Sequence, residues 1–88
     1  MTIHYEYEIR SNPSKNRAEA YIYDKMVGVC EYTIDGDTWN IVHTSVDKEY
    51  QGQGIARALV EFVMKDALGQ GIHLVATCSY AKKILENK

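Results

Sequence analysis

The sequence is poor in several informative residue types: its 88 residues include one proline, two cysteines, one tryptophan and one phenylalanine. It lacks an apolar run long enough to span a bilayer, and its polar start has no apolar stretch of the kind that signal peptides carry. The formal net charge of −2 provides no general attraction to nucleic acid or to an anionic membrane surface. We therefore expect a cytoplasmic protein that binds neither nucleic acid nor membrane.

The two cysteines, Cys30 and Cys78, are far apart in the sequence and do not form a Cys-x-x-Cys pair. A reducing compartment disfavours a structural disulfide between them. The three histidines, His4, His43 and His73, are scattered and complete no zinc-ligand spacing. We therefore expect no metal site.

Length and composition indicate a single domain over residues 1–88. With 45% hydrophobic and 25% charged residues, the composition is that of a soluble globular protein. A chain this short buries a modest fraction of its surface, so we expect a small margin of stability.

The first half of the sequence has the alternation and the residue types of β-strands. Residues 1–10 alternate apolar and polar side chains with period two, and a breaker cluster from Ser11 to Asn16 follows. A tight turn at Asp24-Lys25 is predicted to join two strands of a hairpin, and a turn at Asp35–Thr38 leads into another strand. These three strands are expected at Ala18–Tyr23, Met26–Ile34 and Trp39–Val46.

Strict alternation along Trp39–Val46 divides its side chains between the two faces of the sheet. It places His43 on the same face as Trp39 and Ile41, with Ser45 beside them. It places Thr44 on the opposite face, together with Asn40, Val42 and Val46.

The second half of the sequence predicts a helix, a strand and a second helix. Apolar residues recur at helical spacing from Gly54 to Leu68, and glycines follow as a stop signal. A short strand at Ile72–Thr77 comes next, so a right-handed crossover is expected to pair it in parallel with the strand before the helix. Ser79 is the predicted N-cap of a final helix over Ser79–Asn87. The fold class is α+β.

The stretch from Val46 to Leu59 carries the strongest functional signal. A strand ends at Val46, two glycines stand one residue apart at Gly52 and Gly54, and an apolar helix begins. The first N–H groups of a helix have no partner within the helix, and its dipole adds partial positive charge there. Glycine lets a ligand approach the main chain closely. The pattern predicts a site for a phosphate or diphosphate.

This loop resembles the acyl-CoA-binding signature of the GNAT acetyltransferase superfamily, Gln/Arg-x-x-Gly-x-Gly/Ala between a strand and a helix. Gln51, Gly54 and Ala56 match it, with Gly52 as an additional glycine. The chain is similar in particular to very short GNAT-like proteins. The residues that carry this likeness are the pair His43-Thr44, the loop Gln51-Gly52-Gln53-Gly54 and the run Cys78-Ser79-Tyr80-Ala81.

The resemblance implies a minimal GNAT-like fold that binds acetyl-CoA and transfers its acetyl group to an amine acceptor. Main-chain N–H groups from Gln51 to Ala56 would hold the diphosphate, and the strand edge from Thr44 to Val46 would pair with the pantetheine arm. Arg57 either adds charge near a phosphate or pairs with Glu61. The implied cofactor-binding residues are Thr44, Ser45, Val46, Gln51, Gly52, Gln53, Gly54, Ile55, Ala56 and Arg57.

Three residues are candidates for the chemistry. Cys78 precedes a helix start, which lowers the pKa of a thiol, so it is either an acceptor of the acetyl group or a small buried residue. Histidine is the residue type whose side chain can act as a base near neutral pH, so His43 is either a general base or a core histidine. Tyr80 is a substitute for the usual GNAT tyrosine, whose position is taken here by Leu85, or it only packs.

Two other functions stay open. One is a CoA-binding module without turnover, or one that a partner protein completes. The other is an interaction domain in which the glycine turn is structural. A homodimer through an exposed edge of the first hairpin also stays open.

Overall fold

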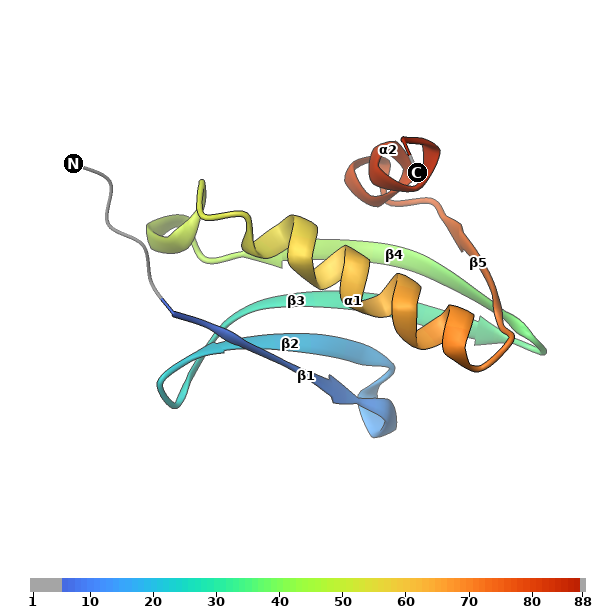
Figure 1. Ribbon diagram of the computed structural model, residues 1–88, viewed down its shortest axis with the longest axis horizontal. Helices are drawn as coiled ribbons and strands as arrows, with labels where there is room; N and C mark the ends of the chain where they lie inside the picture. The colour runs from blue at the N-terminus through green and yellow to red at the C-terminus, as the bar shows by residue number, and fades with distance from the viewer. Residues whose placement is uncertain (1–5, 88) are drawn as a thin grey trace.

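The computed structural model describes residues 6–87 and contains one five-stranded sheet with two helices (Figure 1). The strands lie side by side in chain order. Neighbours from the first to the fourth are antiparallel, and the fourth and fifth are parallel. Their bounds are β1 (Glu8–Asn12), β2 (Arg17–Ile22), β3 (Lys25–Asp35), β4 (Thr38–Val46) and β5 (His73–Ala76). The predicted α+β class and the parallel crossover are confirmed.

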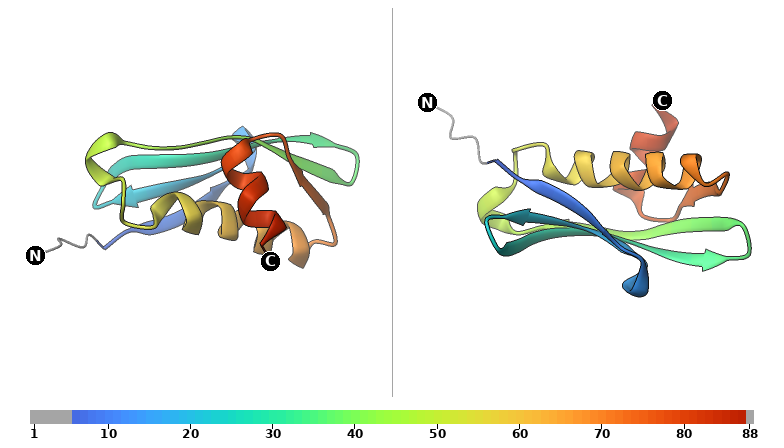
Figure 2. Two further views of the ribbon diagram at one scale, coloured as in Figure 1. Left: turned by 90° about the horizontal axis from the view of Figure 1, so that it is seen from above. Right: turned by 60° about the horizontal axis from the view of Figure 1, so that its bottom comes forward.

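Both helices lie on the same face of the sheet (Figure 2). Helix α1 (Ile55–Gly69) packs across β2, β3 and β4, and α2 (Ser79–Glu86) packs against β5 and α1. The apolar stripe of α1 is buried because its residues recur every three or four positions on the side that faces the sheet. Its buried members are Ile55, Leu59, Val60, Val63 and Ala67. No helix among residues 6–87 is long and apolar enough to cross a membrane.

The first strand differs from its prediction. Residues 1–5 of the predicted strand lie outside the described residues. The observed strand begins at Glu8 and continues through Ser11 and Asn12, which pair with Ala18 and Arg17 of β2. The breaker cluster therefore shortens to the single 3-10 turn η1 (Pro13–Lys15), with Asn16 in the left-handed conformation after it.

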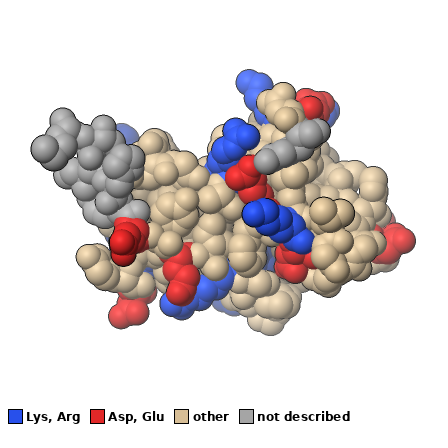
Figure 3. Space-filling view, in the orientation of Figure 1, with Lys and Arg blue, Asp and Glu red and all other residues tan. Residues whose placement is uncertain are grey.

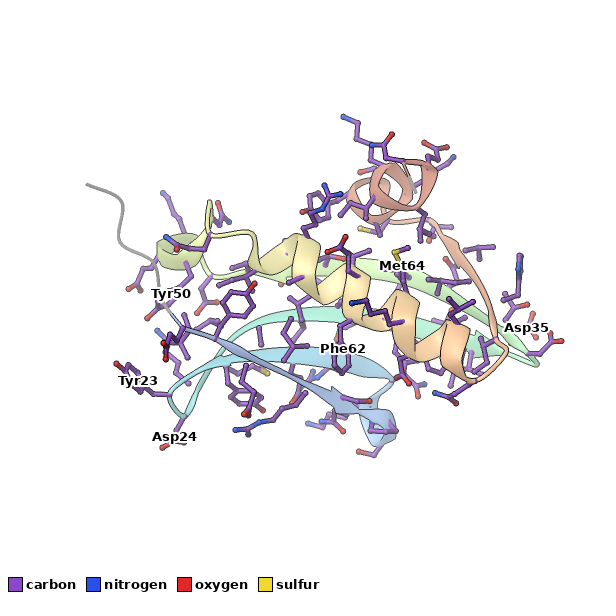
Figure 4. All side chains as sticks on the ribbon, viewed as in Figure 1. Tyr23, Asp24, Asp35, Tyr50, Phe62 and Met64 are labelled. Atoms are coloured by element: carbon purple, nitrogen blue, oxygen red, sulfur yellow. The ribbon has the colours of Figure 1, made fainter. Side chains whose placement is uncertain are left out.

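The tight turn of the β2–β3 hairpin is one residue earlier than predicted. Ile22 pairs with Lys25, so the two turn residues are Tyr23 and Asp24. Tyr23 has a φ of 56°, a conformation that favours glycine. Figure 4 shows Tyr23 and Asp24 at the tip of the hairpin, pointing away from the body of the molecule.

A β-bulge in β4 overturns the predicted division of its two faces. Glu31 of β3 pairs with His43, but the next residue, Tyr32, pairs with Ile41, so Val42 is an extra residue on β4. Side chains before and after the bulge therefore exchange faces. Ile41 is buried beneath the helices, whereas His43 is exposed, and the prediction that they share a face is wrong.

The face of the sheet away from the helices carries a buried carboxylate, Glu19, with 5% exposure. Its Oε2 accepts hydrogen bonds from Asn12 Nδ2 at 2.9 Å and Arg17 Nε at 2.7 Å, and its Oε1 accepts one from Tyr21 Oη at 2.8 Å. The pKa of Glu19 is lowered to about 2, and the hydrogen bond from Asn12 is the largest cause. The hydrogen bonds from Tyr21 and Arg17 lower this pKa further, whereas burial alone would raise it.

Candidate functional site: the glycine loop and the end of β4

The loop between β4 and α1 is held in shape by its own side chains and by two left-handed glycines. After β4, the 3-10 turn η2 (Lys48–Tyr50) leads to Gln51, whose Nε2 donates to Val46 O at 3.1 Å. Gly52 and Gly54 each have a φ of 82°, and no heavy atom lies within 4 Å of a Cβ built at either position. The main chain is therefore open to a ligand on this side.

Six consecutive N–H groups, those of residues 52–57, donate no hydrogen bond to any residue in the described part of the chain. They lie at the start of α1, where the helix dipole is positive. Gln51 differs from its prediction, because its N–H donates to Lys48 O at 3.4 Å. Gln51 closes the loop, and the group of free donors begins at Gly52.

Four of the residues that carry these donors, Gly52, Gly54, Ile55 and Ala56, line a cavity of about 540 Å³. It extends from the loop along the end of β4 to the start of α2, and no charged side chain of residues 6–87 lines it. Its walls contain nine of the predicted site residues, together with Tyr50, which the sequence analysis missed. The lining is Thr44, Ser45, Val46, Tyr50, Gln51, Gly52, Gly54, Ile55, Ala56 and Tyr80. The only sequence signal for Tyr50 is its place next to Gln51.

Tyr50 lies beneath the loop, at the end of the molecule where η2 meets the sheet (Figure 4). Its ring packs against the core, and the Lys25 ammonium lies 5.4 Å from the ring centroid. Tyr50 therefore forms an aromatic wall of the cavity and connects the loop to the β2–β3 hairpin.

The edge of β4 is open beside this cavity. The pairing of β4 with β5 ends at Ile41 and Ala76. The chain then turns away, because the N–H groups of Thr77 and Cys78 both donate to Ile41 O at 3.1 Å. Along residues 42–46, the side of β4 that faces away from β3 has no strand partner within residues 6–87. A ligand with amide groups can pair with this free edge.

Cys78 lies where the two strands part. It is the N-cap of α2, a place that the sequence predicted for Ser79. Its Sγ is 3.8 Å from Thr44 Oγ1. Burial alone would raise the pKa of the Cys78 thiol, but the backbone N–H groups of Ala81 and Tyr80 at the helix start, together with Thr44, favour the thiolate, outweigh burial and lower that pKa. The Cys78 side chain makes no hydrogen bond that caps α2.

The other predicted residues fall into two groups. Tyr80 lines the cavity near Cys78 and is 43% exposed. Gln53, Arg57 and His43 are not part of the lining. Arg57 Nε lies 3.6 Å from Glu61 Oε2, which is the pairing that the sequence offered as its alternative. His43 faces away from the helices, in register with Glu31.

Charge and metal-ligating groups do not gather at this site. Acidic and basic side chains are interspersed on the face that Figure 3 shows. No three His, Cys, Asp or Glu side chains among the described residues form a group that could hold a metal ion. A second cavity of about 480 Å³ between α1, β5 and α2 is lined mainly by apolar side chains, among them Met64, Leu68 and Leu74.

Free amides at a helix start, beside an open strand edge, are groups that can bind an extended ligand with a phosphate group at one end. Residues 17–88 match the sequence model of a family described as GCN5-related N-acetyltransferase, and the chain belongs to this family. The predicted family is thus confirmed. No curated protein sequence matches the chain.

Solved structures agree with the family assignment. The solution structure of a GCN5-like protein from Staphylococcus aureus is similar with a TM-score of 0.70 and 29% identity, over 91% of this chain and 78% of that one. The ribosomal-protein-S18-alanine N-acetyltransferase of Escherichia coli has a TM-score of 0.69 and 22% identity, over 81% of this chain and 49% of that one.

The PaiA N-acetyltransferase of Thermoplasma acidophilum, solved in complex with coenzyme A, has a TM-score of 0.60 and 20% identity. That match covers 64% of this chain and 35% of that one. The Escherichia coli and Thermoplasma proteins support the fold alone, and this chain spans half of their length or less.

Proposed function

We propose that this chain is an acetyl-CoA-dependent N-acetyltransferase that acts on an amine. The observation that carries the proposal is the run of N–H groups at the start of α1, those of residues 52–57, which have no acceptor in the described part of the chain. Four of these residues line the cavity: Gly52, Gly54, Ile55 and Ala56. Since none of the described residues that line the cavity is charged, these N–H groups and the helix dipole are the means by which it would bind a diphosphate.

The rest of the donor would follow the open edge of β4. The pantetheine arm carries amide groups, which can pair with the main chain between Val46 and Thr44. This path runs from the diphosphate toward the start of α2, so the thioester would lie beside Cys78 and Tyr80. The free strand edge and the free amides border one continuous cavity, which supports this orientation.

Cys78 would accept the acetyl group in a two-step transfer. Its thiolate forms a bond to the thioester carbonyl carbon, the bond from that carbon to the CoA sulfur breaks, and the CoA thiolate takes a proton from the Tyr80 hydroxyl or from water. The acceptor amine then attacks the acetyl-cysteine, gives up a proton to solvent, and releases the Cys78 thiolate. The proposal does not depend on His43, which lies on the opposite face of the sheet.

A titration with coenzyme A tests the donor site. We expect the amide NMR signals of Gly52 to Ala56 to shift with a saturable dependence on coenzyme A. The amides of Tyr23 and Asp24, at the tip of the hairpin, serve as an internal control and should stay in place. No uptake of coenzyme A by calorimetry, or shifts spread evenly over the chain, would rule out the donor site.

A turnover assay tests the transfer. Release of free CoA thiol from acetyl-CoA is measured with a panel of amines, and intact mass and peptide mass spectrometry test for acetyl-Cys78. We expect release above the rate without enzyme, and its loss in Cys78→Ala with coenzyme A binding retained. Undiminished release by Cys78→Ala would remove Cys78 from the chemistry.

The second candidate function is a CoA-binding module that does not turn over by itself. One observation favours it: Leu85 takes the usual place of the helical tyrosine and lines the other cavity. Saturable binding of coenzyme A without release of thiol from any amine would support this candidate. Addition of a partner protein that restores release would show that the site is completed from outside.

A further inference from the structure

Three side chains from three elements form a row of hydrogen bonds behind the proposed thioester position. The Cys78 thiol at the start of α2 donates to Thr44 Oγ1 at 3.8 Å, and the Thr44 hydroxyl on β4 donates to Cys30 Sγ on β3 at 3.7 Å. Cys30 and Thr44 are direct cross-strand partners, so the sheet register holds them opposite each other. Thr44 lines the cavity and Cys30 belongs to the core, so this part of the row leads from the cavity wall inward, whereas Cys78 is not among the lining residues.

Cys30 is the inner end of this row and is fully buried. Burial raises the pKa of its thiol to about 11, so Cys30 keeps its proton at neutral pH. A neutral thiol can both accept and donate a hydrogen bond, whereas an aliphatic side chain of similar size can do neither. A side chain that only fills space in the core between β3 and α1 does not require hydrogen-bonding capacity.

We propose that Cys30 is a positioning residue for Cys78: its sulfur holds the Thr44 hydroxyl in place, so that this hydroxyl can serve Cys78 in both of its protonation states. The role of Cys30 in acetyl transfer rests on the function proposed above. Its effect on the Cys78 thiol does not, because the row of contacts exists without a ligand.

The row can reverse its direction without moving a heavy atom. When Cys78 loses its proton, its thiolate can only accept, and the Thr44 hydroxyl hydrogen rotates to donate to it. The Cys30 S–H then rotates to donate to Thr44 Oγ1. Hydrogen bonds to a charged acceptor are the stronger ones, and each bond in a chain polarises the next. Cys30 therefore stabilises the Cys78 thiolate more than it stabilises the thiol.

The effect of Cys30 on the Cys78 thiol can be measured separately from the effects of the groups that act on Cys78 directly. They are the Ala81 and Tyr80 backbone from α2, and the side chain and backbone of Thr44 from β4. No charged side chain is among them. Cys30 is not one of these groups, and it is connected to Cys78 through the Thr44 hydroxyl. A change at Cys30 thus leaves the helix start untouched.

The experiment measures the pH dependence of Cys78 alkylation by iodoacetamide, followed by mass spectrometry of the Cys78 peptide, on the whole chain without acetyl-CoA. Loss of about one hydrogen bond, in part compensated by water, predicts a midpoint about 0.5 pH units higher in Cys30→Val and Cys30→Ala. Cys30→Ser keeps a donor and acceptor, and it should restore the midpoint of the parent chain.

An unchanged or lowered midpoint in Cys30→Val and Cys30→Ala would overturn the proposal, and so would a Cys30→Ser midpoint equal to theirs. Thr44→Val removes the link and serves as the second measurement. With Thr44→Val already present, Cys30→Val should produce no further shift, and a full further shift would contradict the row. If Cys30→Val fails to fold, the comparison of Cys30→Ala with Cys30→Ser decides alone.

Failure of the proposed function gives a different result. If the protein takes up no coenzyme A but the Cys30 variants show the midpoint shift, the row of hydrogen bonds is supported and the proposed acetyl transfer is refuted. If the protein binds and turns over acetyl-CoA but the Cys30 variants show no midpoint shift, only the proposed role of Cys30 is refuted.

Discussion

Replacing Gly54 by alanine tests whether the glycine loop binds the donor. Gly54 is the N-cap of α1 and has a φ of 82°, where an L-residue is disfavoured by about 1–2 kcal/mol. Its missing Cβ points into open space, with no heavy atom within 4 Å. Alanine therefore places a methyl group at the mouth of the loop, or forces the backbone to turn the adjacent N–H groups away from the ligand.

The structure contains a matched control for this change. Gly36, in the β3–β4 turn, also has a left-handed φ of 60° and no heavy atom within 4 Å of a built Cβ. It lies outside the cavity lining. Gly36→Ala and Gly54→Ala should therefore lower the free energy of unfolding by similar amounts, about 1 kcal/mol each, measured by urea denaturation.

Only the loop variant should lose affinity for coenzyme A. A hydrogen bond to a charged group contributes about 1.5–3 kcal/mol, so the loss of one amide contact to the diphosphate predicts a Kd about 10-fold to 100-fold higher in Gly54→Ala. Calorimetry with coenzyme A measures this change. Equal Kd values in Gly54→Ala and Gly36→Ala would refute the idea that the loop backbone holds the ligand.

Three further predictions concern stability. The pKa of Glu19 is lowered from 4.5 to about 2 in the folded chain, so its contribution is present above about pH 4.5 and lost as the pH falls toward 2. Glu19→Gln should lower the free energy of unfolding by about 2 kcal/mol at pH 7 and weaken its dependence on pH between about 2 and 4.5. The same pH dependence in Glu19→Gln as in the parent chain would contradict this. Tyr23→Gly should raise the melting temperature, because Tyr23 is 93% exposed with a left-handed φ of 56°; a lower melting temperature would show that its ring has a packing role. Gly28→Ala should destabilise the chain by about 1–3 kcal/mol in urea, because its Cβ would lie 3.0 Å from Ser45 O and 3.2 Å from Leu59 Cδ1; wild-type stability would mean that β3 and α1 can separate freely.

Local patterns in the sequence were sufficient for most of the secondary structure. The helical stripe from Ile55 to Ala67 and the β-rich runs of β2 to β4 predict their elements because each depends on residues close together in the chain. The same holds for the glycine loop, where two glycines between a strand and an apolar helix indicate free amides. The errors there were single residues, such as the N–H of Gln51, which the turn η2 engages.

The faces of β4 could not be predicted in this way. The sequence around Val42 contains no glycine or other signal of a bulge, so strict alternation predicts both faces without interruption. Only the pairing with β3 shows that Val42 is an extra residue. One extra residue moves every later side chain to the other face of the strand, so His43 lies outside the core and outside the candidate site, contrary to its prediction. The buried Glu19 was missed for a related reason: Arg17 and Tyr21 lie two residues away on the same strand, but Asn12 reaches Glu19 only when β1 and β2 pair.

The sequence by itself determined the order of the elements, the family and the backbone loop at the start of α1, because short-range backbone preferences are sufficient for these. The tertiary structure alone decided which side chains meet at the end of β4. Thr44 lies between Cys30 and Cys78 because a bulge, a strand register and the end of β5 act together. Such contacts between residues distant in the chain depend on the packing of whole elements, which no local pattern encodes.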